Sequence, residues 1–312
     1  MRVAGSEPGD AHARPPDPVD PERSGVRSAS SSRRSASACG SRIGPPLLAW
    51  ACELVAAASP DAPRFADEPR PALERHYDWL ARERDVDGDG LITIVLPDES
   101  GLDDAPKYAP VFGWMAHDRP GYYRVVWRAR RHRYSATAIV ARHEEHVEDV
   151  LVNVLYARAL LALGGRFALR AQRIVQALLE RSWDPAAALF WDLAGGGERP
   201  IRVSTWSSLA PLALPGIPSV AISEPTFNPR WDRFRCWRGP SWMATAWLLV
   251  PPLRELGYAA AADHVVDSLM RAVRRSGLRE YYDPLTGDGL GARRFAMSAL
   301  VLDLLAQPRL EP

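Results

Sequence analysis

Crowded carboxylates are the first feature of this sequence that suggests chemistry. Four acidic residues fall within seven positions, at Asp98, Glu99, Asp103 and Asp104. Carboxylates held close together repel one another, and confinement among aromatic side chains raises the pKa of some of them, which is how a carboxyl group becomes a general acid near neutral pH. The spacing alone still favours a solvated acidic loop over a catalytic one.

A second carboxylate with an aromatic setting lies in the C-terminal part of the chain. Glu280 precedes Tyr281 and Tyr282, and the turn signal Asp283-Pro284 follows directly. This pattern predicts a carboxylate between a helix end and a tight turn. Taken alone, it does not identify a catalytic base.

Between these two segments lies a short stretch suited to binding a polar ring. Trp237, Arg238, Gly239 and Trp242 surround a predicted helix start at Pro240. Flat aromatic rings and a forked hydrogen-bond donor together fit a sugar, which offers an apolar face and hydroxyl groups. The alternative, that both tryptophans are core residues at a helix start, is equally consistent with the sequence.

Residues 85–90 have the opening pattern of a calcium loop. Asp85, Asp87 and Asp89 alternate around Gly88, which is the arrangement of oxygen ligands that a hard cation requires. The twelfth position is Leu96, where an EF-hand loop has a bidentate glutamate. A polar turn that ends the preceding helix is therefore favoured over a metal site, and we expect no metal and no cofactor.

The elements that position these residues are mainly helices. Leu73, Tyr77 and Leu80 share one face of a helix predicted to end at Asp85, and residues 85–146 are predicted to form a long loop region. A helical hairpin follows, with its turn near residue 164 and its end near residue 183, and further helices are predicted over residues 240–256, 258–275 and 293–306. Strand signals are few, so the predicted fold class is all-α with long functional loops.

Asp149 and Asn153 belong to the first helix of that hairpin. Their i,i+4 spacing places both side chains on one face of the helix. They either line a pocket or cap and solvate the helix start.

Composition and charge exclude several classes of partner. The net charge is +1, and 46% of the residues are hydrophobic, so the chain has a globular composition without the basic excess of a nucleic-acid or anionic-membrane binder. No apolar run is as long as a membrane-spanning helix, which needs about 18 residues. Three cysteines without a CxxC motif indicate neither a disulfide scaffold nor a zinc ribbon and favour a reducing compartment.

The N-terminal part differs in character from the rest. Residues 1–44 are rich in Pro, Ser and Arg and are predicted to be a disordered tail, residues 45–72 a linker or weak helix, and residues 73–312 the folded domain. The pair Arg33-Arg34 precedes an apolar segment, but the pair lies far from Met1 and Glu53 interrupts the segment. We therefore expect a cytoplasmic protein rather than an exported one.

Taken in order, these segments resemble the inverting α-glycosidases that include glycoside hydrolase family 63 and the mannosylglycerate hydrolase-like enzymes. The resemblance extends over about residues 73–307 and rests on five stretches: residues 77–80 with 85–90; residues 99–106; Glu148 and Asp149 with Asn153; residues 236–242; and residues 280–287 with Gly289, Phe295 and Ser298. Their joint occurrence in one order argues against chance.

The resemblance implies an (α/α)6 toroid, with two concentric rings of helices and the site at one end. It implies that Asp103 is the general acid and Glu280 the general base that activates water. Inversion requires such a pair of carboxyl groups, roughly 6.5–9.5 Å apart across the sugar ring. The residues that it places at the sugar subsite are Glu99, Asp104, Asp149, Asn153, Trp237, Arg238, Gly239, Trp242 and Tyr282.

Three departures from the family pattern leave alternatives open. Asp104 stands where the family usually has Asn, so either Asp103 or Asp104 carries the proton. Asp98 and Met297 replace frequent tryptophans, which changes the fit of a substrate. The sequence supplies roughly six or seven helices, fewer than a closed double ring needs, so the toroid is predicted to be partial, and a second copy of the chain is one way to cover its exposed faces.

The sequence therefore predicts an inverting hydrolase of small α-linked glucosides or mannosides, such as glycosylglycerates or oligosaccharides. The rival prediction is an inactive, truncated remnant or a sugar-binding fragment. A third is an all-α binding protein with a calcium-stabilised loop at Asp85, Asp87 and Asp89.

Overall fold

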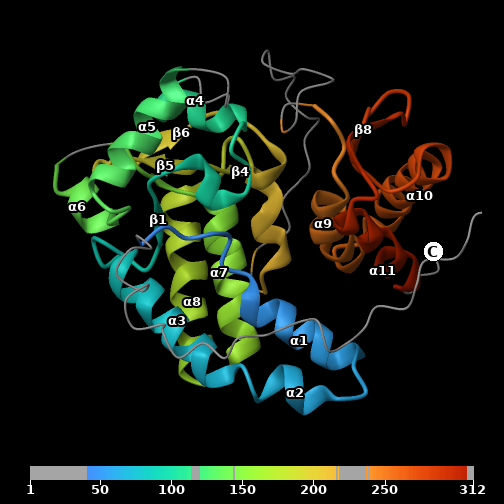
Figure 1. The fold of residues 1–312 in the computed structure, drawn as a ribbon, viewed down its shortest axis with the longest axis horizontal. Helices are drawn as coiled ribbons and strands as arrows, with labels where there is room; N and C mark the ends of the chain where they lie inside the picture. Colours follow the sequence, from blue (N-terminus) through green and yellow to red (C-terminus); the bar gives the residue numbers. More distant parts are fainter. Residues whose placement is uncertain are drawn as a thin grey trace, which may run out of the picture. The chain divides into compact units, whose positions relative to one another are not determined.

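A computed structural model describes residues 41–113, 120–142, 145–215, 217, 237 and 239–307. Most of these residues are helical (Figure 1). The helices of the first part are α1 (Leu48–Ala58), α2 (Ala62–Ala66), α3 (Arg70–Glu83), α4 (Ala109–Phe112), α5 (Pro120–Arg131), α6 (Ala136–Val140), α7 (Val150–Leu163) and α8 (Arg166–Ala177). The described C-terminal part contains α9 (Met243–Glu255), α10 (Ala259–Ser276) and α11 (Leu300–Ala306).

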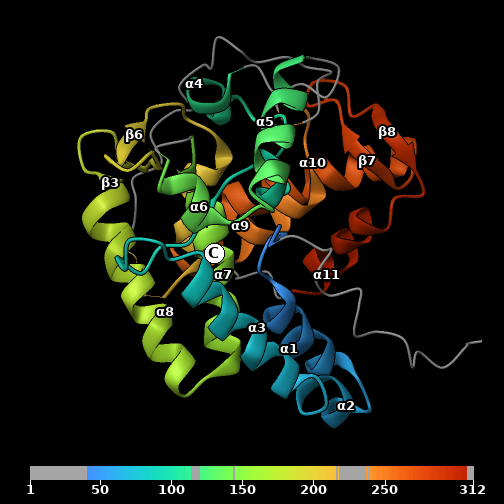
Figure 2. The ribbon, with the colours of Figure 1, turned by 60° about the vertical axis from the view of Figure 1, so that its left-hand side comes forward.

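Helix α7 is the centre of the larger core. Eleven of its 14 residues are buried, because apolar side chains surround the helix on all sides. Asp149 caps its start, and Gly164 ends it with a φ of 69°, from which the chain turns back into α8. Helices α1, α3 and α8 all pack against α7 (Figures 1 and 2). The predicted hairpin is thus present at residues 150–177.

Helices α9, α10 and α11 enclose a second, smaller core. Val250 of α9, Val266 of α10 and Val301 of α11 are buried within it, together with the ring of Tyr282. The chain leaves α10 through Gly277 into a two-stranded hairpin of β7 (Arg279–Tyr282) and β8 (Gly289–Arg293). The helices predicted over residues 240–256 and 258–275 are present with slightly shifted ends, whereas the helix predicted over residues 293–306 is present only from Leu300, after the end of β8 and a 3-10 turn.

The prediction of a mainly helical fold is confirmed, and short strands lie between some of the helices. An antiparallel four-stranded sheet has the order β1 (Thr93–Ile94), β2 (Val147–Glu148), β5 (Asp192–Ala194), β6 (Arg199–Ile201). A second pair, β3 (Trp183–Asp184) and β4 (Leu189–Phe190), follows α8. Strands of two or three residues are too short to show an alternating pattern in the sequence, which is why the sequence does not reveal them.

The predicted loop region over residues 85–146 is also partly wrong, because it contains α4, α5 and α6. Pro120 opens α5, and Val125, Arg128 and Ala129 are its buried residues, at the i, i+3 and i+4 spacing of a helix. The neighbouring glycine and tyrosines at positions 121–123 obscure this signal, since these residue types are weak helix formers.

The folded part begins earlier than predicted. Ile43 is 8% exposed and donates its backbone N–H to Glu99, and Ser41 donates its backbone N–H to the carbonyl of Arg133. Residues 41–44 therefore belong to the folded part and not to a tail, and residues 1–40 of the predicted tail lie outside the described residues. The predicted linker at residues 45–72 contains α1 and α2. Within the described ranges, no helix is both long and apolar enough to cross a membrane.

Candidate functional site

Asp103 and Asp104 lie in a tight loop that is anchored on both sides. The 3-10 helix η2 (Pro97–Ser100) ends at Gly101, whose φ of 75° reverses the chain. Leu102 and Ala105 are buried on either side of the two aspartates. Asp103 keeps intermediate exposure, whereas Asp104 is only 8% exposed. The loop thus holds two adjacent carboxylates at different depths.

Glu99 fixes this loop from inside the protein. Its carboxylate forms a bidentate ion pair with Arg84, with distances of 2.7 and 3.0 Å, and both side chains are fully buried. It also accepts the backbone N–H groups of Ile43 and Val95. Glu99 was predicted to contact sugar, but protein groups occupy both of its oxygens. It is a positioning residue.

Asp149 and Asn153 have the same internal role. Asn153 is fully buried, accepts the N–H of Ile92 and donates to the Ile92 carbonyl, so it holds the segment before β1 against α7. Asp149 caps α7 by accepting the N–H of Val152. Both side chains therefore have internal partners, which agrees with the capping alternative for Asp149, and their contact with a substrate stays a prediction.

Lys107, the only lysine of the chain, joins Asp149 to the four-stranded sheet. Its Nζ lies 2.6 Å from Asp149 Oδ2 and 3.1 Å from Asp192 Oδ2, and it donates to Ser207 Oγ at 3.0 Å. Tyr108 donates its hydroxyl to Asp149. Burial raises the pKa of Asp192 to about 6, against the attraction of Lys107. Burial also acts to lower the pKa of Lys107, but attraction to the two aspartates outweighs it and raises that pKa.

Glu280 lies on β7, and its neighbour β8 fixes its carboxylate. Glu280 Oε2 accepts the backbone N–H of Ala292 at 2.8 Å. Gly291 makes this possible, because its φ is 63° and a Cβ there would lie 2.5 Å from Glu280 Oε2 and 2.7 Å from Glu280 Cβ. The hairpin thus holds the predicted base in one orientation.

A stack of aromatic rings lies beside that hairpin. The centroids of Trp237 and Trp242 are 3.8 Å apart with nearly parallel planes, and the ring of Tyr281 lies 4.9 Å from Trp242. Ser241 forms a pair of backbone hydrogen bonds with Tyr282, which ties the start of α9 to β7. These two backbone hydrogen bonds therefore join the segment that contains Trp242, the predicted sugar-binding residue, to the strand that contains Glu280, the predicted base.

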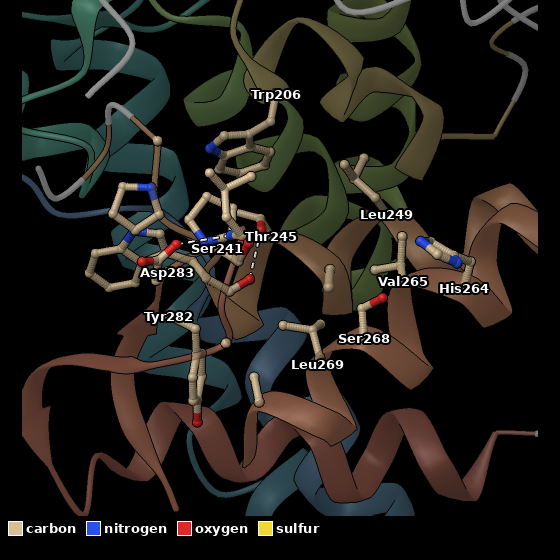
Figure 3. Close-up of a pocket in the computed structure, with 18 of the residues that line it drawn as sticks. Trp206, Ser241, Thr245, Leu249, His264, Val265, Ser268, Leu269, Tyr282 and Asp283 are labelled. Carbon is tan, nitrogen blue, oxygen red and sulfur yellow. Dashed lines mark hydrogen bonds between the residues drawn. The ribbon is translucent and has the colours of Figure 1, made fainter. Parts of the chain in front are cut away.

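A cavity of about 980 Å³ opens next to this stack (Figure 3). Trp206, from the 3-10 helix η5 (Trp206–Ala213), lies across it from His264 and Ser268 of α10. The predicted site residues among its lining are Trp237, Gly239, Trp242 and Tyr282. A space lined by aromatic rings and scattered hydroxyl groups suits a small polar ring ligand.

The cavity brings together only part of the predicted site. Neither Asp103 nor Glu280 is among the described residues that line it. The hydroxyl of Tyr282 donates to the carbonyl of Gly277 and accepts the N–H of Arg279, so it serves the hairpin. Arg238 lies outside the described residues.

Trp206 and His264 are cavity residues that the sequence does not reveal. An isolated tryptophan ahead of an apolar run, and a single histidine on an amphipathic helix, are typical of core or surface residues as well as of a site. No local signal distinguishes these roles, because the cavity joins segments almost 60 residues apart, from Trp206 to His264.

Comparisons with known proteins bear on the family of the chain. The family described as the mannosylglycerate hydrolase MGH1-like glycoside hydrolase domain matches residues 11–215 and 213–298. A mannosylglycerate hydrolase from Thermus thermophilus is 29% identical, over 82% of this chain and 74% of that protein. A glucosylglycerate hydrolase from Mycolicibacterium hassiacum is 24% identical, over 78% of this chain and 68% of that protein.

A similar solved structure supports membership of the same family. The crystal structure of a family 63 mannosylglycerate hydrolase from Thermus thermophilus in complex with glucose has a TM-score of 0.69 and 28% sequence identity to this chain. The similarity covers 84% of this chain and 74% of that one. The sequence resemblance is therefore confirmed, and the chain belongs to the mannosylglycerate hydrolase-like family of glycoside hydrolases.

Proposed function

We propose that this protein is an inverting glycoside hydrolase that acts on small α-linked glucosides or mannosides, glycosylglycerates among them. Asp103, or its neighbour Asp104, protonates the leaving oxygen, and Glu280 activates the water that attacks the opposite face of the sugar. The observation that carries this proposal is the β7–β8 hairpin, where a carboxylate with a fixed orientation adjoins the stack of Trp237, Trp242 and Tyr281.

The relatives suggest the substrate class. The names of two similar proteins specify mannosylglycerate and glucosylglycerate, and similar crystal structures carry glucose or D-glycerate. A stack of tryptophans beside a cavity with Ser241, Thr245 and Ser268 offers the apolar and hydroxyl contacts that such a glycoside needs. No cofactor is needed, because two carboxyl groups and water suffice for the reaction.

The finer form of the fold is part of the proposal. Antiparallel helix pairs α7/α8 and α9/α10 are the repeating units from which an (α/α)6 toroid is built, and we propose that they are segments of a partial toroid. Leu302 of α11 is 66% exposed and Leu54 of α1 is 40% exposed. Self-association that covers such residues stays a prediction.

An inactive remnant is the second candidate. The observation that favours it is the separation of the parts of the site: the cavity has the aromatic platform, but Asp103 and Glu280 are not among its described lining residues. A remnant would retain the fold and the platform without turnover.

Replacing Asp103 and Asp104 one at a time distinguishes an active hydrolase from an inactive remnant. We expect wild-type protein to hydrolyse at least one of glucosylglycerate, mannosylglycerate and short α-glucosides. Asp103→Asn should reduce turnover by about 10²–10⁴-fold, because the leaving oxygen loses its proton donor. Asp104→Asn restores the residue typical of the family and should retain turnover.

Initial rates of sugar release, with circular dichroism to confirm folding, measure both effects. Loss of turnover in Asp104→Asn, with turnover retained in Asp103→Asn, would identify Asp104 as the acid. Equal rates for wild type and both variants would contradict a catalytic role for this loop.

A further inference from the structure

Helix α5 (Figures 1 and 2) presents two large aromatic side chains to the solvent. The side chains of Tyr123 and Trp127 are each 63% exposed, whereas large aromatic residues are on average well buried. Their i,i+4 spacing places both rings on one side of the helix, about 6 Å apart along its axis. Neighbouring exposed rings mark a candidate binding surface.

Arginines flank these two rings on both sides. Helix α5 contains four arginines and no acidic residue. The helical period places Arg124 and Arg131 on one side of the rings and Arg130 on the other, and all three are exposed. Arg131 Cζ also lies 5.6 Å from the ring centroid of Trp127. Of these three arginines, only Arg124 has an ion pair with a described residue, Glu145, at 3.7 Å. The exposed side of α5 therefore attracts anions.

The inner side of α5 connects these rings to the loop of the candidate acids. The ring of Tyr122 lies edge-on to Tyr123, with centroids 5.5 Å apart, and its hydroxyl donates to Asp98 Oδ1 at 3.0 Å. Burial and then repulsion by Asp98 raise the pKa of Tyr122 to about 12, and Asp103 makes a smaller contribution. The aromatic side chains thus lead from the surface of α5 toward the segment that contains Asp103.

We infer that the exposed side of α5 binds an acidic oligosaccharide that extends outward from the candidate active site. This surface, the α5 face, consists of Tyr123, Arg124, Trp127, Arg130 and Arg131. Tyrosine and tryptophan rings offer a sugar ring a flat apolar surface together with a hydroxyl or N–H group. Guanidinium groups bind carboxylates through two parallel hydrogen bonds. A chain of uronic acids has both a ring and a carboxylate in each unit.

The position of the α5 face also indicates which part of a substrate it would hold. An inverting hydrolase protonates the leaving oxygen from its acid, so the leaving group lies on the side of that acid. The α5 face adjoins the Asp103 loop through Tyr122 and Asp98. The bound chain would therefore belong to the leaving group, and the substrate class would include glycosides of acidic sugar chains. This inference rests on the proposed function.

An anionic membrane is another surface that attracts arginines and aromatic rings. A helix that lies in a membrane surface inserts a continuous apolar face into it. In α5, however, Val125 and Ala129 are buried in the protein, and its exposed side has only two rings between arginines. The α5 face therefore suits a ligand that stacks on single rings better than a lipid layer.

Isothermal titration calorimetry with two tetrasaccharides of equal length tests the inference. The acidic probe is a tetramer of α-1,4-linked galacturonic acid, and the neutral probe is maltotetraose. The full-length Glu280→Gln variant is titrated, so that binding is measured without turnover. The acidic probe should bind about 10-fold more tightly than the neutral probe, because charged hydrogen bonds to arginine add to stacking. Added salt should reduce this difference.

Two substitutions, each with a matched control, locate the binding surface. Trp127→Ala should weaken binding of the acidic probe by about 10-fold, because the stacked ring is lost. Arg130→Gln should weaken it by about 5-fold and leave maltotetraose binding unchanged. Leu169→Ala removes a 62% exposed apolar side chain from α8, and Arg274→Gln removes an exposed arginine from α10; both should leave affinity unchanged. All four side chains are exposed, so the variants should fold, which circular dichroism verifies.

Absence of binding of the acidic probe at millimolar concentration would overturn the inference. Equal affinity of the parent protein and Trp127→Ala would overturn the assignment to the α5 face. Binding to phosphatidylserine-containing vesicles without binding of the acidic probe would likewise overturn it in favour of a membrane. Binding of the acidic probe that depends on Trp127 and Arg130, in a protein that hydrolyses no glycoside, would support the binding surface and contradict the proposed function alone.

Discussion

Replacing Glu280 by Gln should reduce the hydrolysis of a susceptible glycoside by about 10²–10⁴-fold, because the amide cannot accept a proton from the attacking water. The change preserves the size of the side chain, and the amide oxygen can still accept the N–H of Ala292, so the β7–β8 hairpin should persist. Steady-state kinetics on the substrate found in the panel, together with the Tm, measure the effect. Glu255→Gln, an exposed acid at the end of α9, is the matched control and should retain full activity.

A glycine substitution tests the position of Glu280 without altering its chemistry. Gly291→Ala places a Cβ within 2.7 Å of Glu280 Cβ and should displace the carboxylate, with a loss of kcat of about 100-fold. Gly195→Ala has the same left-handed strain, at a φ of 68°, but no atom within 4 Å of its Cβ. Gly291→Ala should lose more stability than Gly195→Ala because of these close contacts, and Gly195→Ala, which has the backbone strain alone, should retain kcat. Equal activity of both variants would show that the orientation of Glu280 is unimportant.

Replacing Lys107 by Met should destabilise the protein by about 3–5 kcal/mol, because it leaves Asp149 and Asp192 buried together without a cation. One carboxylate caps α7 and the other accepts the N–H of Val150, so both are held where they cannot reach water. Urea unfolding followed by tryptophan fluorescence measures the difference.

The control for this prediction is an ion pair at the surface. Arg82→Met breaks the pair with Glu83, whose side chains are 64% and 41% exposed, and should cost less than about 1 kcal/mol. A loss for Lys107→Met as small as that of Arg82→Met would mean that one of the two buried aspartates is protonated in the folded protein.

Helices with a clear apolar face were predictable from the sequence. Leu73, Tyr77 and Leu80 all lie in the core on α3, and the glycines at 164 and 165 mark the turn between α7 and α8. Helix α5 and the short strands were not predictable, since Tyr122 and its neighbours carry weak propensities and a two-residue strand has no period.

The predicted site residues differ in where the structure places them. Trp237 and Trp242, predicted at the sugar subsite, line the cavity, and their contact with a sugar stays a prediction. Glu99, Asp149 and Asn153 were placed at the subsite through the resemblance, whereas the structure gives them internal partners: Arg84 for Glu99, Lys107 for Asp149 and the backbone of Ile92 for Asn153. Their partners lie at sequence separations from 15 to 61 residues, so local spacing does not reveal whether a buried polar residue supports a site or lines it.

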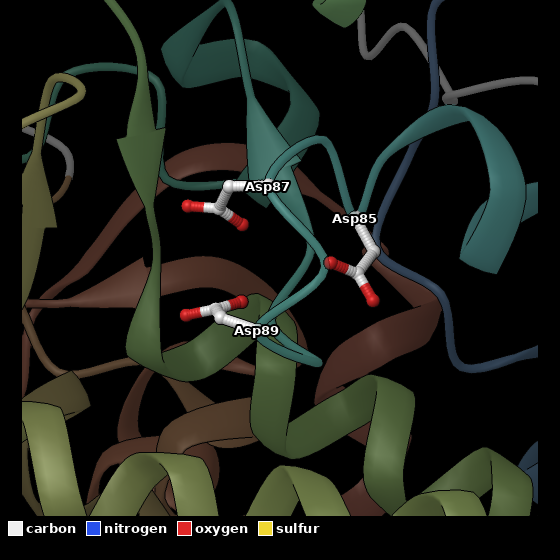
Figure 4. A group of neighbouring side chains, drawn as sticks. All are labelled: Asp85, Asp87 and Asp89. Atoms are coloured by element: carbon white, nitrogen blue, oxygen red, sulfur yellow. The ribbon is translucent and has the colours of Figure 1, made fainter.

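The acidic turn at residues 85–90 (Figure 4) shows the same limitation of local patterns. The sequence favours a polar turn because Leu96 occupies the position of the expected glutamate. Only the pairing of β1 with β2 places Glu148 opposite Thr93, next to the turn. A neighbour contributed by another strand is invisible to a motif that counts positions along one segment.

Hydrolysis of an α-glycoside with inversion is the activity that we propose for this chain. Its most direct test is proton NMR of the sugar released in the first minutes of hydrolysis of glucosylglycerate or mannosylglycerate, before mutarotation. We expect the β anomer to appear first, because inversion of an α-linkage releases the β sugar. Initial release of the α anomer would contradict the mechanism, and no release from folded protein across the panel would contradict the proposed activity and favour the inactive remnant.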